Sequence, residues 1–162
     1  MKLDLAVIVL TYNEEVNLPN CLKSLQRLDC DIIVVDSGST DHTVGIAEEA
    51  GARVFYHPFE SQARQLNWAL ENISLQGQWV LRIDVDERLT PELSNELSSK
   101  LSVIDKEITG LYLKRRVHFM GRWIRHGGYY PTWLLRVWRS GCAKAEDRLM
   151  DEHMVLLEGA ID

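Results

Sequence analysis

The 162-residue chain contains few cysteines and no long apolar run. Its three cysteines, Cys21, Cys30 and Cys142, are scattered and form no C-x-x-C pair. This odd set argues against a disulfide framework and against a zinc site, so we expect reduced thiols that are buried or chemically idle. No apolar stretch approaches the ~20 residues that a membrane-spanning helix needs. These absences favour an ordinary soluble globular protein.

The first residues also lack the pattern of a signal peptide. The apolar run at residues 5–10 is short, follows Asp4 and is not followed by a small-residue cleavage site. We therefore expect a protein of the cytoplasm, or one bound peripherally at the cytoplasmic face of a membrane.

Acidic residues are missing from one long segment, although the net charge of the chain is −6. Residues 108–145 hold eight lysines and arginines and no acid, whereas the segments on either side are acidic. Arginines interleaved with aromatic rings suit a phosphate-bearing or sugar ligand, a nucleic acid or an anionic membrane surface. They equally suit the solvated outer face of a strand pair. The aromatic residues of this basic aromatic band are Tyr112, Phe119, Trp123, Tyr129, Tyr130, Trp133 and Trp138.

Residues 1–107 alternate apolar runs with segments of helical character. Four apolar runs predict buried strands, at residues 5–10, 32–35, 53–57 and 79–83. Four further segments predict helices, at residues 17–27, 41–50, 61–73 and from Thr90 onward. Asn17 and Thr90 are expected to cap the first and last of these helices, and Gly51 to end the second. This alternation predicts an α/β fold with a mainly parallel sheet flanked by helices.

The pattern changes after Gly110. Residues 110–121 and 132–141 are expected to form longer strands with glycine turns, separated by a loop at residues 125–131. The second half would therefore add antiparallel strands to a mixed sheet. We treat residues 1–107 and 108–162 as two halves of one domain.

Polar residues follow the predicted strands at their carboxyl ends, where open α/β sheets bind ligands. The first strand leads into Thr11, Tyr12, Asn13 and Glu14. The second ends at Asp36, which can accept hydrogen bonds from a base or ribose while the small residues behind it cap the next helix. Arg64, early in the third helix, would pair with a diphosphate or be a solvated surface residue.

Asp84 and Asp86 stand two residues apart after the fourth strand. On an extended chain their carboxylates would point the same way and, if unpaired, would repel each other. Mg²⁺ or Mn²⁺ removes that conflict and takes its remaining ligands from phosphate oxygens and water. We therefore predict a divalent metal site at Asp84 and Asp86, and the alternative is a solvated acidic turn.

Four blocks of the sequence together resemble the inverting glycosyltransferases of family 2, which have the Rossmann-like GT-A fold: LAVIVLTYNEE, IIVVDSGSTDHT, QARQLNWAL and WVLRIDVDE. The most similar subgroup builds lipopolysaccharide core, capsule or exopolysaccharide. The resemblance implies that residues 1–107 bind a nucleotide sugar. It would place Thr11, Tyr12, Asn13 and Glu14 near the uracil and ribose, Asp36 on the base, Arg64 near the diphosphate, Asp84 at ribose or metal, and Asp86 on the metal.

The second half resembles the family less specifically. Such enzymes carry a catalytic carboxylate near the acceptor, and in this chain acids return only from Glu146 onward. The resemblance points to Glu152 as the general base. Asp151 and Asp147 are the alternatives, and all three can also be ordinary surface acids. The basic aromatic band falls where the family places its acceptor.

We therefore predict an inverting glycosyltransferase that moves a sugar from a nucleoside-diphosphate carrier, expected to be UDP, to a glycan or lipid-linked acceptor in cell-envelope polysaccharide biosynthesis. The alternatives are a sugar nucleotidyltransferase and a non-catalytic nucleotide-sugar-binding module, and a nucleic acid is not an expected partner. Because the second half is short, we expect an incomplete carboxyl-terminal part. Its last ~15 residues would be mobile or packed against a second copy of the chain.

Overall fold

The computed structural model describes residues 3–128, 130–147 and 153–162. The first half consists of β1 (Leu5–Thr11), α1 (Leu18–Leu25), the 3-10 turn η1 (Gln26–Leu28), β2 (Asp31–Asp36), α2 (Thr43–Glu49), β3 (Arg53–Tyr56), α3 (Gln62–Asn72), β4 (Trp79–Arg82) and α4 (Pro91–Lys100). The second half adds β5 (Ile108–Arg115), β6 (His118–Phe119), β7 (Arg122–Trp123), β8 (Thr132–Arg139), β9 (Ala143–Ala145), β10 (Met154–Leu156) and β11 (Ala160–Ile161).

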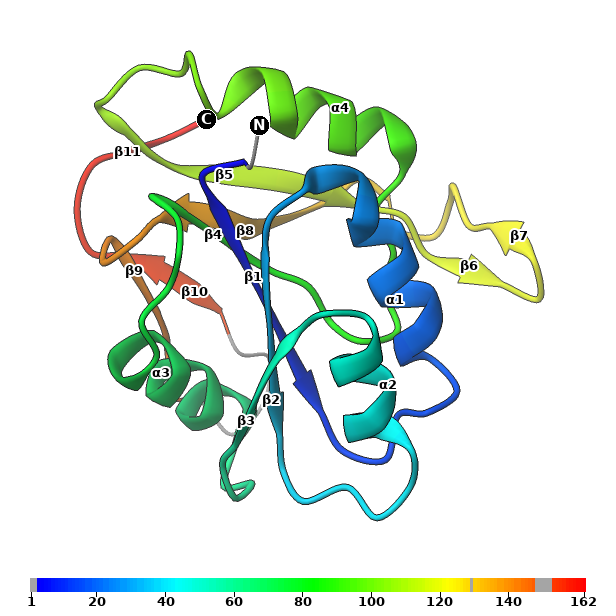
Figure 1. Ribbon diagram of the computed structural model, residues 1–162. Coiled ribbons are helices and arrows are strands. Elements are labelled where there is room, and N and C mark those ends of the chain that lie inside the picture. Colours follow the sequence, from blue (N-terminus) through cyan, green and yellow to red (C-terminus); the bar gives the residue numbers. More distant parts are fainter. Residues whose placement is uncertain (1–2, 129, 148–152) are drawn as a thin grey trace.

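Seven strands form one central sheet in the order β11-β5-β8-β4-β1-β2-β3, with helices on both of its faces (Figure 1). Strands β4, β1, β2 and β3 are parallel to one another, whereas β8 runs antiparallel to both β4 and β5. The predicted α/β fold, parallel in its first half and mixed in its second, is confirmed. Because β8 pairs with β4, the two halves of the sequence share one sheet.

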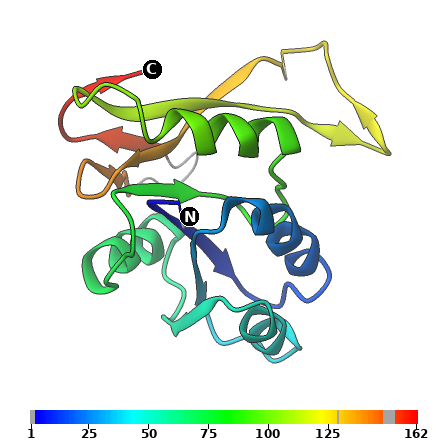
Figure 2. The same cartoon turned by 45° about the horizontal axis from the view of Figure 1, so that its top comes forward.

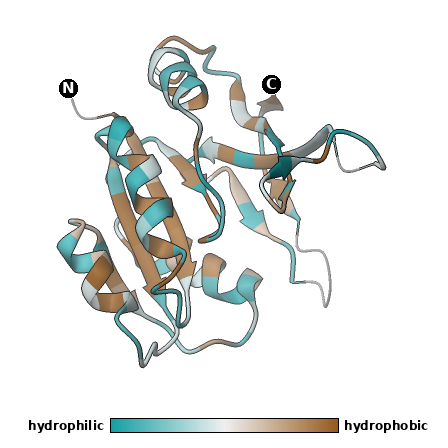
Figure 3. Ribbon diagram, turned by 90° about the vertical axis from the view of Figure 1, so that its right-hand side faces the viewer, coloured by the Kyte–Doolittle hydropathy of each residue, from teal (hydrophilic) through white to brown (hydrophobic). Residues whose placement is uncertain are grey.

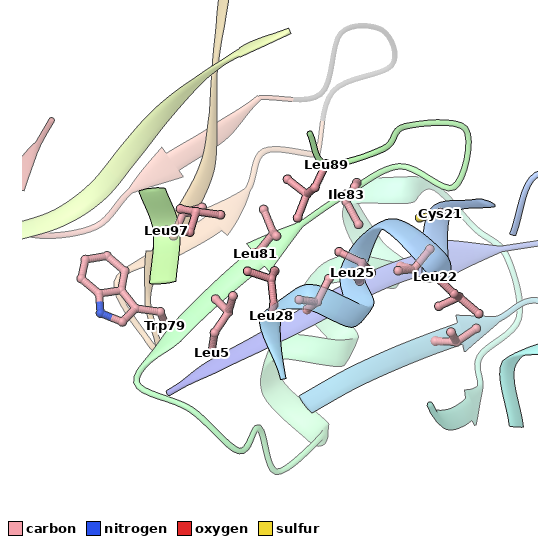
Figure 4. Packing of buried hydrophobic residues seen from close by; sticks show 14 of the residues in the cluster. Leu5, Cys21, Leu22, Leu25, Leu28, Trp79, Leu81, Ile83, Leu89 and Leu97 are labelled. Atoms are coloured by element: carbon pink, nitrogen blue, oxygen red, sulfur yellow. The ribbon is translucent and has the colours of Figure 1, made fainter. Parts of the chain in front are cut away.

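The sheet is buried on both faces because the side chains of β1 alternate between two apolar clusters. Leu5, Val7 and Val9 share a cluster with buried residues of α1, α2 and α4, while Ala6 and Ile8 share one with residues of α3 and β9. Figure 4 shows Leu5 in the first cluster, with Leu25 and Leu28. All five of these β1 side chains are 0% exposed. Figure 3 shows the same arrangement, with hydrophobic central strands and helices whose hydrophilic residues lie away from them. Such two-sided burial explains why the strands are continuous apolar runs.

Two of the three expected helix-end residues act as predicted. The Thr90 hydroxyl accepts a hydrogen bond from the Leu93 amide at 3.2 Å, and Gly51 ends α2 with a φ of +80°. Asn17 does not cap α1, which corrects that expectation. The chain already turns at Glu14, whose carbonyl accepts from the amide of Leu18, and the Asn17 side chain donates to the Glu14 carboxylate at 2.9 Å.

The last described residues pack against their own chain. β10 pairs with β9, and β11 pairs with β5. Asp162, the final residue, forms an ion pair with Lys100 at the end of α4. Residues 153–162 are therefore tied to their own chain, because the edges of β5 and β9 supply backbone partners that sequence periodicity does not reveal.

The cysteines and the lengths of the helices bear on two further expectations from the sequence. The three cysteines are not joined in disulfides, and Cys21 and Cys142 are buried. Within the described parts of the chain, none of the helices combines the length and apolar character needed to cross a membrane.

Candidate active site

Asp36 organises the loop that follows β2. Its carboxylate accepts hydrogen bonds from the Thr11 hydroxyl at 3.0 Å, from the Gly38 and Ser39 amides at 2.9 and 2.8 Å, and from the Ser39 hydroxyl at 2.5 Å. The residue is only 3% exposed. Asp36 therefore fixes the shape of this loop and ties it to the end of β1, whatever else it binds.

The loops after β1 and β2 are cross-linked along their length. Asn13, which has a φ of +51°, donates from its amide to the Ser39 hydroxyl, and its side-chain oxygen accepts from the Thr40 amide, both at 2.8 Å. The Glu14 amide donates to the Thr43 hydroxyl at 2.8 Å. These bonds turn two loops that are distant in sequence into one rigid platform at the carboxyl edge of the sheet.

Two tyrosine rings stand exposed at this platform. Tyr12 is 58% exposed and Tyr56 is 66% exposed. Gly38 has a φ of +97°, and a Cβ built there would lie 3.4 Å from the Tyr56 ring. The small, left-handed residue at position 38 therefore lets the chain turn close beside an aromatic surface.

The acidic residues after β4 lie in a turn and not on an extended chain. β4 ends at Arg82, and the Glu87 amide donates to the Asp84 carbonyl at 2.9 Å. The predicted same-side pair of unpaired carboxylates is thus wrong. Asp84 contacts Arg136 at 2.8 Å and Arg82 at 3.4 Å, and Asp86 is left exposed.

Arg136 of β8 neutralises two carboxylates at once. Its guanidinium lies 2.8 Å from Asp84 and 2.8 Å from Glu87. Burial raises the pKa of Asp84, but the hydrogen bond and charge of Arg136, aided by Arg82, outweigh it and hold that pKa below its ordinary value. Burial prevails for Glu87 and raises its pKa. In this turn, Asp86 is therefore the carboxylate without a described cationic partner.

The same turn keeps the thiol of Cys21 protonated. Burial, together with the negative charges of Glu87 and Asp84, raises the pKa of Cys21 to about 12. The thiol approaches the Asp84 carbonyl at 3.9 Å. Cys21 therefore behaves as the idle, buried thiol that the sequence predicts.

Arg64 lies at the first turn of α3, where the Ser61 hydroxyl accepts from its amide at 3.1 Å. Its guanidinium pairs with Glu60 at 2.7 Å and with Asp147 at 2.9 Å. The side chain is 58% exposed, so these surface contacts leave it open to exchange for another anion. The contact with Asp147 links α3 to the end of the second half that carries the candidate bases.

The favoured general base, Glu152, and the alternative Asp151 lie outside the described residues. Asp147 is described, and its carboxylate is held by Arg64. Asp147 is thus already engaged in an ion pair with α3.

A cleft of ≈ 1500 Å³ opens on the other side of the acidic turn, between α4 and the base of the β6–β7 hairpin. Asp86 lies on its wall together with Lys114, Trp133 and Tyr130. The Lys114 ammonium stands 4.5 Å from the centre of the Trp133 ring. The residues that line the cleft do not include the loops after β1 and β2.

The chemistry of the acidic turn fits a cation that shares its ligands with a substrate. Within the described residues, no cluster of three or more His, Cys, Asp or Glu side chains is arranged to hold a metal. Mg²⁺ and Mn²⁺ commonly use one or two protein carboxylates, with phosphate oxygens and water completing the shell. Exposed Asp86, with Asp84 beside it, meets that requirement.

The sequence interpretation missed Arg82 and Arg136, which decide the charge of the turn. Both are nearly buried, at 7% and 9% exposure. A signal was present, because each arginine interrupts an apolar strand, and a buried arginine nearly always has an acidic partner. The identity of that partner was not readable from the pattern.

Residues 6–151 match the family described as Glycosyl transferase family 2. The chain belongs to this family. The lipopolysaccharide core biosynthesis glycosyltransferase LpsC of Rhizobium meliloti is 38% identical over 135 residues, covering 80% of this chain and 47% of LpsC. An uncharacterized glycosyltransferase of Rickettsia conorii is 38% identical over 93 residues, covering 57% of this chain and 32% of its own length. The chain thus spans at most about half the length of these relatives.

Solved structures show the same GT-A fold. S. aureus TarS in complex with UDP superposes with a TM-score of 0.62 at 24% identity, covering 88% of this chain and 48% of TarS. Glucosyl-3-phosphoglycerate synthase of Mycobacterium tuberculosis, in complex with UDP, superposes with a TM-score of 0.56 at 28% identity, covering 70% of this chain and 45% of the synthase. The mannosyltransferase PcManGT of Pyrobaculum calidifontis, in complex with GDP-Man and Mn²⁺, superposes with a TM-score of 0.57 at 23% identity. The match covers 71% of this chain and 36% of the mannosyltransferase.

Proposed function

We propose that this chain forms the donor-binding and catalytic part of an inverting glycosyltransferase, which moves a sugar from a nucleoside-diphosphate carrier to a hydroxyl of a cell-envelope glycan or lipid-linked acceptor. The observation that carries the proposal is the edge of the sheet where β4, β1 and β2 lie side by side. There a rigid platform of loops adjoins a turn that presents an exposed carboxylate, Asp86. Family membership supports sugar transfer, and the UDP complex of the 28% identical synthase supports the choice of UDP.

The platform would bind the nucleoside. Tyr12 offers an exposed ring for the base, and Asn13 and Glu14 lie next to it on the cross-linked loop. Asp36 acts mainly by holding the loop in shape, because its carboxylate is already engaged. Arg64 would reach the diphosphate by exchanging Glu60 and Asp147 for phosphate oxygens, which offer a guanidinium the same paired contact.

The acidic turn would hold the divalent cation. Asp86 is the primary ligand in this proposal, and Asp84 would join it if its bond to Arg136 is exchanged. A bound Mg²⁺ or Mn²⁺ supplies positive charge at the diphosphate, where negative charge develops as the leaving group departs. The chain's own contribution is to place a single uncompensated carboxylate beside the platform.

Transfer itself would be a single displacement. The acceptor hydroxyl loses its proton to a carboxylate, for which Glu152 is our choice with Asp151 as the alternative. The new bond forms between that oxygen and the anomeric carbon while the bond from the anomeric carbon to the diphosphate oxygen breaks. The configuration inverts, and the nucleoside diphosphate leaves.

The cleft beside α4 would receive the acceptor. Its wall combines Trp133, Tyr130 and Lys114 with the acidic turn, and aromatic rings with cations suit a sugar that carries phosphate. LpsC, which is named for lipopolysaccharide core biosynthesis, supports an acceptor from the cell envelope.

The proposal is tested by calorimetric titration of UDP and of GDP in Mn²⁺ and again in chelator. We expect the affinity for UDP to fall at least tenfold with chelator in the natural chain, because the diphosphate loses its bridging charge. Asp86→Asn should bind UDP weakly in both conditions. Glu96→Gln is the matched control, because Glu96 is an exposed carboxylate on the same cleft. It should behave like the natural chain.

Different results would contradict different parts of the proposal. Equal affinity with and without chelator would remove the metal from the proposal, and no affinity for either nucleotide would remove the donor site. With a nucleotide sugar as substrate, release of nucleoside diphosphate is expected. Release of pyrophosphate would instead identify a nucleotidyltransferase.

A further inference from the structure

The β6–β7 hairpin projects from the ends of β5 and β8, clear of the helices (Figures 1 and 2). It is closed by a two-residue turn in which Met120 and Gly121 both have positive φ, +48° and +75°. This geometry is typical of tight hairpins. A further hydrogen bond from the Ile124 amide to the Val117 carbonyl, at 2.9 Å, extends the ladder toward the body. The hairpin is therefore a defined projection.

The tip of the hairpin is apolar and fully presented to solvent. Phe119 is 67% exposed and Met120 is 87% exposed, and they are adjacent at the turn. A positive φ is uncommon for methionine and places its long side chain at the outermost point. Exposed apolar residues at such a tip cost solubility, so a surface that receives them would explain their presence.

Four arginines flank the hairpin, with Arg122 next to the turn and Arg115, Arg116 and Arg125 at the base. Arg115, Arg116, Arg122 and Arg125 are all exposed, and none forms an ion pair with a described carboxylate. Arg116 and Arg125 stack on Trp123 instead, at 4.9 and 4.3 Å from its ring. The edge of the Tyr130 ring also packs on Trp123, at 5.0 Å between ring centres. Stacking fixes the guanidinium groups without neutralising them.

We propose that the β6–β7 hairpin docks the protein on an anionic lipid membrane. Phe119 and Met120 would enter the boundary between headgroups and acyl chains, and the four arginines would contact lipid phosphates. An apolar tip with one cation beside it and three more at its base matches the two layers that a membrane surface presents. A nucleic acid fits less well, because the Trp123 ring that could stack on a base is already covered by Arg116, Arg125 and Tyr130.

The charge distribution would also orient the docked protein. The acid-free segment at residues 108–145 would face the anionic surface, while the acidic residues 1–107 would be repelled from it. The base of the hairpin and Asp86 line the same cleft. If the proposed function holds, docking therefore brings the acceptor cleft to the membrane and favours a lipid-linked acceptor. The docking itself does not depend on catalysis.

The test is cosedimentation of the whole chain with vesicles of phosphatidylcholine, with or without phosphatidylglycerol. We expect binding to the anionic vesicles that weakens as salt is added, and little binding to the neutral ones. Phe119→Ser with Met120→Ser should reduce binding strongly, and Arg122→Ser should reduce it about fivefold. Val103→Ser is the matched control, because Val103 is 80% exposed but lies beyond α4, away from the hairpin.

All of these residues are exposed or at a turn, so thermal unfolding should verify that each variant is folded. Equal binding to neutral and anionic vesicles, no binding to either, or loss of binding in the Val103 variant would overturn the proposal. Tighter binding to a single-stranded RNA than to anionic vesicles, undiminished in the tip variant, would assign the surface to nucleic acid. UDP titration of the same samples reports separately on the donor site.

Discussion

Asp36 and Asp84 come at or just beyond the ends of two parallel strands of one sheet, but their carboxylates find partners in different ways. Asp36 is 3% exposed and receives hydrogen bonds from residues of its own loop and of the neighbouring strand β1. The side chain of Asp84 is 37% exposed and depends on two arginines, one of which comes from the other half of the chain. One carboxylate is enclosed and satisfied by neutral donors, and the other is accessible and held by charge.

This difference in partners suggests different roles: Asp36 maintains the structure of its loop, whereas Asp84 can exchange its partners. Four neutral donors converge on the buried carboxylate of Asp36, so the loop after β2 keeps its shape. An ion pair of an accessible carboxylate can be replaced by another charged partner, such as a metal cation for Asp84. The loop after β2 is thus suited to shape a binding surface, and the turn after β4 to change partners when a ligand arrives.

The largest effect is expected for Asp36→Ala, which leaves the Thr11 hydroxyl and two backbone amides without their acceptor. We expect unfolding to become easier by about 3 kcal/mol, measured by urea titration, because unsatisfied buried donors are costly. Asp36→Asn should lose less, since one oxygen remains. Glu48→Ala, an exposed carboxylate on α2, is the control. A loss in Asp36→Ala no greater than in the control would contradict the structural role.

A smaller effect is expected for Arg136→Gln, which leaves Asp84 and Glu87 without their shared cation. Unfolding should become easier by about 2 kcal/mol, the cost of losing charged hydrogen bonds at a half-buried site. Added Mn²⁺ should restore part of this stability without nucleotide, because the freed carboxylates attract it. The thermal midpoints of Arg136→Gln and Asp36→Ala, each measured with and without Mn²⁺, provide the comparison. An equal rise in thermal midpoint with Mn²⁺ in both variants would contradict the distinction between the loop after β2 and the turn after β4.

The smallest effect is expected for His42→Gln, at the exposed end of the platform. The hydrogen bond and charge of Glu15, at 2.8 Å, raise the pKa of His42 above its ordinary ~6.5. Protonated His42 therefore stabilises the fold below that ordinary value, and the contribution is lost as pH rises through the folded pKa. The thermal midpoint of the natural chain should be slightly higher than that of the His42→Gln variant in mild acid, and the two midpoints should converge in mild alkali. A difference in thermal midpoint that grows as the pH rises would contradict a stabilising role for protonated His42.

Local patterns in the sequence predicted the first half well. All four helices and all four strands of residues 1–107 are found close to their expected bounds, since each depends on apolar spacing, capping and turn residues within a few positions. The residues that we predict to bind the ligand also lie where parallel strands end, because topology alone brings those ends to one edge. Asn17 failed as a cap because the turn at Glu14 had already supplied the backbone partner.

The charge pairs of the candidate site depend on contacts between segments that are distant in the sequence. Arg136 and Asp84 are 52 positions apart, and Arg64 and Asp147 are 83 apart. These pairs depend on strand order, which periodicity does not specify, since an arginine in a strand says only that an acid must be near. The sequence by itself determined the alternation of strands and helices, the family, and the acids after β4. The tertiary structure decided which of those acids is free, because burial beside β8 gives Asp84 and Glu87 a shared guanidinium and leaves Asp86 in solvent.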